Sequence, residues 1–220
     1  MFRIITLERE YGCGCAGIAS ALAESLGWKL WDYLLTEEIA KQAHVDCGVV
    51  QQREEKVDGA FYRLAKTFWR GSYERSMPLS ESQTFDADCM VRMMESITAR
   101  IAEEGNAVIV GRGAPYFLRQ REDTFRVFLY APQEEKIRRL VASGTKLDDA
   151  QELVETVDRE RMTFIKHYFN ADWPTRWLYH MMINTSIGDE KVISTILNAM
   201  RNLQDRSTAP TAPLRGVALK

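Results

Sequence analysis

A glycine-rich segment near the start of the chain has the residue types of a loop that binds phosphate. It follows an apolar run and reads Glu10-Tyr11-Gly12-Cys13-Gly14-Cys15-Ala16-Gly17. Glycines let several backbone N–H groups crowd around an anion, and the first turn of a following helix adds partial positive charge. Our working hypothesis is therefore that this loop holds a phosphate group.

One interpretation of the loop is the P-loop of proteins that bind nucleoside triphosphates. Gly12 and Gly17 have the G-x-x-x-x-G spacing of that motif, which continues with lysine and then serine or threonine. Ile18 and Ala19 stand at those two positions. In this register the chain lacks both the lysine charge and the hydroxyl that contacts magnesium.

A second interpretation is a dinucleotide-binding fingerprint. Gly12, Gly14 and Gly17 spell G-x-G-x-x-G, and Asp32 follows Gly12 by twenty residues, as the acidic residue of that motif does. It would make the protein an NAD-binding oxidoreductase. The long helical insert and the arginine-rich segment described below speak against it. A third alternative is a tight turn that needs glycine and binds nothing.

An arginine flanked by glycines is a second candidate for phosphate chemistry. Arg112 lies between Gly111 and Gly113, directly after the apolar run 107–110. A guanidinium in such a place is well suited to two-pronged contact with a phosphate. The alternative is a structural ion pair, with Asp32 as a candidate partner.

Further positive charge falls in two helical segments after residue 130. Phosphoryl transfer needs several cations around the moving group, and without the loop lysine arginines would have to supply them. The alternative is a solvated face whose charges pair with one another, favoured by Asp158 and Glu160. The arginines concerned are Arg138, Arg139, Arg159 and Arg161.

Five short apolar runs must position these residues, and they alternate with helical patterns. This alternation predicts an α/β fold with a parallel sheet covered on both faces. Ligands of such sheets sit beyond the carboxyl ends of the strands, where the glycine loop, Asp32, Arg112 and residues 184–186 would meet. The runs cover residues 2–7, 29–31, 107–110, 125–130 and 178–183.

The helical patterns fill the intervals between the runs. A helix begins after the glycine loop at residue 18, and another is expected to begin at Thr36. A loop is expected over residues 71–83, and the Pro-, Ala- and Thr-rich tail 205–220 is expected to be disordered. The other predicted helices cover residues 57–68, 85–104, 133–142, 148–169 and 189–203.

Length and composition limit the classes of protein to which the chain can belong. A chain of 220 residues with 45% hydrophobic content is expected to form one domain with a sizeable core. A net charge of -2 and a pI near 6.0 argue against nucleic acid or an anionic membrane as the main partner. The start of the chain lacks a signal-peptide pattern, so we expect a cytoplasmic protein.

The cysteines Cys13 and Cys15 form a C-x-C pair inside the loop. The three histidines form no cluster with zinc-ligand spacing, so we predict no metal site and interpret both cysteines as small loop residues. A thiol at a helix N-terminus can have a lowered pKa, which makes chance oxidation or alkylation an expectation here.

Taken together, the motifs resemble the cytidylate kinase-like family of P-loop proteins. The resemblance covers residues 4–203 and rests on the order of four pieces: residues 10–14, Val110-Gly111-Arg112-Gly113, Asp158-x-x-Arg161 and Ile183-Asn184-Thr185-Ser186. It implies a nucleoside monophosphate kinase fold: three α/β/α layers, strand order 2-3-1-4-5 and a single domain over 1–204. It also implies a helical acceptor-binding insert over 36–104 and a mobile lid over 143–175.

The reaction implied by the resemblance is phosphoryl transfer from ATP, with Mg²⁺, to CMP or dCMP. The loop residues from Gly12 to Ile18 would wrap the donor phosphates, and Arg138 or Arg139 would lie against the donor base. Arg112 would hold the acceptor phosphate, and Asp32 stands where the acceptor insert begins. The resemblance makes Arg159 and Arg161 lid arginines that close over the transferring group.

The chain departs from the family at the loop. Family members often read Gly-Ser-Gly-Gly, where this chain has Gly12-Cys13-Gly14-Cys15, and authentic cytidylate kinases carry a loop lysine. We therefore expect weak ATP affinity and slow turnover. The alternative is a nucleotide-binding regulatory protein of the same fold that has lost catalysis.

Overall fold

The computed structural model describes residues 1–32, 34, 35, 38 and 87–206. Its central feature is one five-stranded parallel sheet with the order β2-β3-β1-β4-β5, as the resemblance implied. The strands are β1 (Ile4–Arg9), β2 (Lys29–Trp31), β3 (Ala107–Val110), β4 (Thr124–Tyr130) and β5 (Met181–Asn184). The expected central position of the first strand is therefore confirmed.

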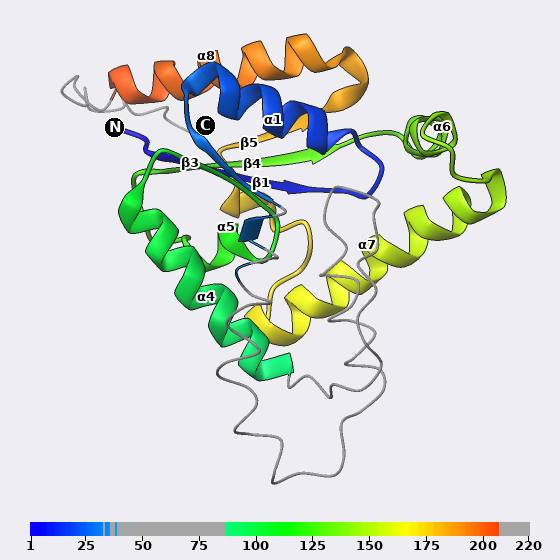
Figure 1. Cartoon of the computed structure of the whole chain (residues 1–220), viewed down its shortest axis with the longest axis horizontal. Helices are drawn as coiled ribbons and strands as arrows, with labels where there is room; N and C mark the ends of the chain where they lie inside the picture. Colours follow the sequence, from blue (N-terminus) through cyan, green and yellow to red (C-terminus); the bar gives the residue numbers. More distant parts are fainter. Residues whose placement is uncertain (33, 36–37, 39–86, 207–220) are drawn as a thin grey trace, which may run out of the picture.

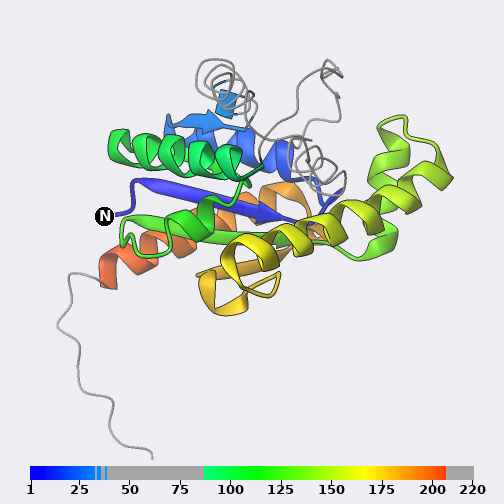
Figure 2. The ribbon, with the colours of Figure 1, turned by 90° about the horizontal axis from the view of Figure 1, so that it is seen from below.

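Helices cover both faces of the sheet (Figure 1). One face carries α1 (Cys15–Leu26) and α8 (Asp189–Arg206). The other carries α4 (Ala87–Glu104), the short α5 (Ala114–Phe117) and α7 (Leu147–Phe169). The remaining helix, α6 (Gln133–Ala142), pairs with α7 at the end of the molecule opposite the N-terminus (Figure 2).

The alternation of side chains along β1 explains the two cores. Ile5 and Leu7 pack with Ile18 of α1, while Ile4 packs on the opposite face among residues of α4. All six residues of β1 are buried, as expected for a central strand of a parallel sheet. The unexpected part is that the last two, Glu8 and Arg9, are charged.

Several predicted boundaries are corrected by the structure. The first strand covers 4–9 and not 2–7, and the fifth covers 181–184 and not 178–183. Residues 176–178 form a single 3-10 turn, which buries Leu178 and leaves its carbonyl to accept a hydrogen bond from Arg126 at 2.9 Å. The apolar character of Leu178 thus reflects a buried turn before the strand.

The ends of two helices also differ from the predicted ones. The helix after the glycine loop begins at Cys15, three residues before its predicted start. The last helix continues to Arg206, since no glycine or proline interrupts it. Asp205 and Arg206, predicted to belong to a disordered tail, are therefore helical. The start expected at Thr36, the helix over 57–68, the loop over 71–83 and the rest of the tail lie outside the described residues.

None of the helices in the described part of the chain combines the length and apolar character needed to cross a bilayer.

The core position of Ile18 yields a stability prediction. Its side chain is fully buried, so Ile18→Lys should place an unpaired charge in the core and lower the free energy of unfolding by about 3–5 kcal/mol. Urea denaturation followed by circular dichroism measures this. Ser20→Lys, at an exposed position of the same helix, is the control and should change stability little. Equal stability of the two variants would contradict the packing described here.

Candidate functional site

The glycine loop lies between the end of β1 at Arg9 and the start of α1 at Cys15. Gly12 and Gly14 have φ angles of 77° and 83°, in the left-handed region that favours glycine. Gly14 is also crowded: a Cβ there would lie 2.5 Å from Nη1 of Arg139. The loop therefore adopts this backbone conformation only with glycine at these positions.

The structure gives the P-loop motif a different register from the one predicted. In that motif the G-x-x-x-x-G-K segment joins a strand to a helix, and here the segment between strand and helix runs from Arg9 to Cys15. Arg9 thus occupies the position of the first glycine of the motif. Cys15 occupies the position of the lysine, and Ala16 that of the serine or threonine. The register that used Ile18 and Ala19 is wrong, because both lie inside α1 and are buried in the core.

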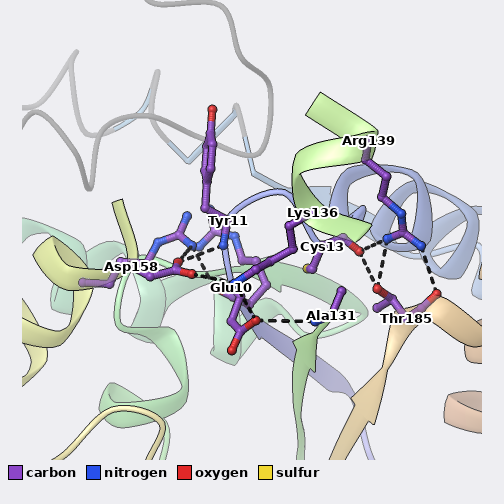
Figure 3. A network of polar contacts seen from close by, with 10 residues as sticks. Glu10, Tyr11, Cys13, Ala131, Lys136, Arg139, Asp158 and Thr185 are labelled. Atoms are coloured by element: carbon purple, nitrogen blue, oxygen red, sulfur yellow. Dashed lines mark hydrogen bonds and ion pairs between the residues drawn. The ribbon is translucent and has the colours of Figure 1, made fainter. Parts of the chain in front are cut away.

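Asp158 and Arg161 of α7 bind the backbone of the loop. Figure 3 shows Asp158 beside Tyr11. Asp158 Oδ1 accepts a hydrogen bond from the N–H of Tyr11 at 2.8 Å. Arg161 Nη1 donates to the carbonyl of Arg9 at 2.8 Å and to Asp158 Oδ1 at 3.1 Å. These contacts place the Asp158-x-x-Arg161 segment on the loop. Arg159, by contrast, is exposed.

Lys136 of α6 is a component that the sequence analysis missed. It is 8% exposed, and its Nζ lies 3.0 Å from Glu10 Oε2 and 3.5 Å from Asp158 Oδ2. Its ammonium group therefore joins the loop, α6 and α7. The available signal was its spacing: Lys136 precedes Arg139 by three residues, which puts the two on one face of a helix.

The side chain of Arg139 connects the loop to the segment after β5. It donates to the carbonyl of Cys13, and its Nη1 and Nη2 donate to Oγ1 and the carbonyl oxygen of Thr185, each at 3.0 Å. Thr185 Oγ1 also donates to the carbonyl of Cys13 at 2.7 Å, so the segment after β5 reaches the loop as predicted. Arg138 points elsewhere: its side chain is 71% exposed and pairs with Glu135 at 2.7 Å.

Arg112 lies in an unusual backbone turn after β3. Gly111, Arg112 and Gly113 have φ angles of 63°, 59° and 74°, and the arginine is 1% exposed. Burial, followed by the nearby charge of Arg9, lowers the pKa of Arg112 to about 9, and Asp32 opposes this. Residues held in a sparsely populated backbone conformation, as Arg112 is, cluster at functional sites.

A pocket of about 290 Å³ opens over the loop. Residues 9–16 form its floor, and Arg139, Leu140, Ser143 and Arg161 complete the lining. The lining thus combines the glycine-rich loop with three arginines, Arg9, Arg139 and Arg161, which are residue types suited to phosphate.

The two loop cysteines are not activated thiols. Burial raises the pKa of Cys13 to about 12, and burial together with the neighbouring Cys13 raises that of Cys15. Their exposed fractions are 1% and 4%. The expected effect of the helix N-terminus is therefore wrong in direction, because loss of solvent outweighs it.

The residues at the loop do not fit a resident magnesium ion. Ala16 stands where the motif has its hydroxyl ligand, and no three His, Cys, Asp or Glu side chains gather as a metal site within the described residues. A magnesium ion at this site would have to be held mainly by the phosphates of a bound nucleotide, as this cation commonly is.

Comparison with known proteins identifies the family. The model of the cytidylate kinase-like family matches residues 4–187. The chain belongs to this family. No curated protein matches it.

Two solved structures show the fold of this cytidylate kinase-like protein in other chains. An uncharacterised protein from Eubacterium ventriosum is 21% identical with a TM-score of 0.64, covering 92% of this chain and 99% of its own. A gluconokinase from Sinorhizobium meliloti is 13% identical with a TM-score of 0.54, covering 92% of this chain and 94% of its own. At these identities the similarity establishes the P-loop kinase fold alone.

The buried thiols provide a test of the loop geometry. At pH 7.5 we expect iodoacetamide to label Cys13 and Cys15 at least about tenfold more slowly in the folded protein than in urea, because both thiols are protonated and enclosed. Mass spectrometry of the peptide that holds both residues measures the rates. Labelling of the native loop as fast as in urea would contradict the described burial.

Proposed function

We propose that the protein transfers a phosphoryl group from ATP to a nucleoside monophosphate, with CMP and dCMP as the first acceptors to examine. The observation that supports this most directly is the pocket over the loop, whose lining combines the glycine-rich loop with three arginines. Arg112 follows the neighbouring strand β3 at the same edge of the sheet. The family of the chain supports the reaction class.

On the donor side, the loop residues from Gly12 to Ala16 would hold the ATP phosphates through N–H groups. Arg139 would keep the loop in shape, since it binds the carbonyl of Cys13 and the segment after β5. Arg161 would face the phosphates from α7. Arg159 and Arg138, both exposed, would act at this site only after a change in side-chain position.

On the acceptor side, Arg112 would bind the acceptor phosphate with Asp32 near it. We further propose that residues 36–104 form the acceptor-binding insert and that 143–175 act as a lid. Helix α7 lies within that lid, and its contacts with Tyr11 and Arg9 would link lid position to the state of the loop.

A regulatory nucleotide-binding protein is the alternative function. It is favoured by Cys15 and Ala16, which replace the lysine and hydroxyl of the motif in the register that the structure gives. A turnover assay with MgATP and a panel of nucleoside monophosphates separates the two functions. ADP formation that depends on one acceptor supports the kinase. Binding of MgATP without turnover for any acceptor would contradict the kinase and support the regulator.

The role of Arg112 is tested by Arg112→Lys. An ammonium keeps the charge but cannot make a two-pronged contact, so acceptor binding should weaken by about 1.5–3 kcal/mol, measured as the acceptor KM and by calorimetry. The control is Arg126→Lys, whose half-buried guanidinium binds the carbonyls of Leu178 and Arg121. The control should leave acceptor affinity unchanged. Unaltered acceptor affinity in a folded Arg112→Lys protein would exclude the assignment.

A further inference from the structure

Arg9 has no role in the sequence motifs, yet it occupies a defined place in the loop. It is the last residue of β1 and stands where the P-loop motif has its first glycine. The same motif has lost its lysine at Cys15. Within one loop, a cation is therefore missing at the last position and present at the first.

The guanidinium of Arg9 reaches across the sheet from β1 to the end of β3. It lies over Gly111, where a Cβ would come within 2.9 Å of Arg9 Cζ. Arg9 thus lies beside the residue that precedes Arg112, and it also lines the pocket over the loop. This is the space between the proposed donor and acceptor sites.

The donors of Arg9 are only partly used by the protein. Its Nη1 lies 3.5 Å from Glu8 Oε1, and its Nε has no hydrogen-bond partner among the described residues, although Arg9 is 5% exposed. A buried guanidinium N–H without a partner is costly, and a ligand oxygen would satisfy it. Arg3, which directly precedes the same strand, donates Nη2 to the carbonyls of Glu103 and Glu104.

Arg9 also keeps its positive charge despite burial. Burial alone would lower its pKa, but Glu8 and Asp32 outweigh this and raise the pKa above its usual range. The charge of Arg9 in turn lowers the pKa values of Arg112 and Arg161, after burial. Arg9 therefore lies near both arginines, and an anion among the three would relieve their mutual repulsion.

We propose that Arg9 binds the terminal phosphate of the donor nucleotide and supplies the charge that the motif lysine supplies elsewhere. The inference rests on the proposed ATP-dependent function and adds a phosphate-binding residue to it. Arg9 forms no covalent bond with the phosphoryl group; it places a positive charge and hydrogen-bond donors where the negative charge develops.

The test compares Arg9→Met and Arg9→Lys with the matched pair Arg3→Met and Arg3→Lys. Arg3 is a suitable control because it comes from the same strand region and lies over Gly105 as Arg9 lies over Gly111. Calorimetry gives the dissociation constants of MgATP and of inorganic tripolyphosphate, and thermal unfolding gives the stability of each variant. Turnover is measured with the best acceptor.

We expect Arg9→Met to weaken binding of both MgATP and tripolyphosphate by roughly tenfold or more, because it removes a charged hydrogen bond. Turnover should fall by about 100-fold or more. Arg9→Lys should retain part of the affinity, and both Arg3 variants should bind within about twofold of the natural protein. Adding Cys15→Lys to Arg9→Met returns a cation to the motif position and should recover affinity.

A purely structural role for Arg9 would lower the unfolding temperature while leaving both dissociation constants within twofold, and this result would overturn the inference. If Arg9→Met does not fold, Arg9→Lys decides by the same criterion. A folded double variant with no recovery would also count against it. Absence of turnover, with tripolyphosphate binding still dependent on Arg9, would overturn the proposed function alone. Absence of all binding by the natural protein would overturn both.

Discussion

The balance of buried charge at the carboxyl end of β1 is the constraint on which the rest of the site depends. Four cations and four carboxylates gather there, most of them less than a tenth exposed. Removing one member of such a set leaves an uncompensated buried charge, at a cost of about 3–5 kcal/mol. The loop, α6 and α7 are therefore held in one arrangement by this set of charges, of which Arg9, Glu10 and Arg161 also line the pocket. The cations are Arg9, Arg112, Lys136 and Arg161, and the carboxylates are Glu8, Glu10, Asp32 and Asp158.

The sequence contained most of the fold because the sheet obeys strong local rules. Runs such as 107–110 are apolar throughout, which is the pattern of a strand buried on both faces, and the glycine loop marks the strand that feeds it. Errors are confined to element ends. At residue 178 an apolar side chain was buried by a turn, and at residue 15 the helix began before its apolar stripe. Periodicity reports burial, and burial does not by itself distinguish a strand from a turn.

The site was less accessible to sequence reasoning, for a physical reason. The spacing of the glycines predicted a loop but placed the P-loop motif in the wrong register. Arg9 stands where the motif has its first glycine, so only the ends of β1 and α1 reveal the register. Lys136 and Arg9 were missed because a charge in a helix or at a strand end is usually solvated, whereas tertiary contacts bury these two. Arg139 and Arg138 are adjacent and chemically identical, and helix geometry alone turns one to the loop and the other to solvent.

The position of the cation within the loop has a consequence for how the site works. A lysine at the start of α1 would belong to the loop alone, whereas the carbonyl of Arg9 is bound by Arg161 and its guanidinium lies over Gly111. Asp158 completes this connection by accepting a hydrogen bond from the N–H of Tyr11 in the same loop. Under the proposed function, an anion entering the pocket would compete with Asp158 for the loop while gaining the charge of Arg9 and Arg161. Under the proposed function, donor binding and the position of α7 would be coupled through these few contacts, since a change in either would alter the partners of the other.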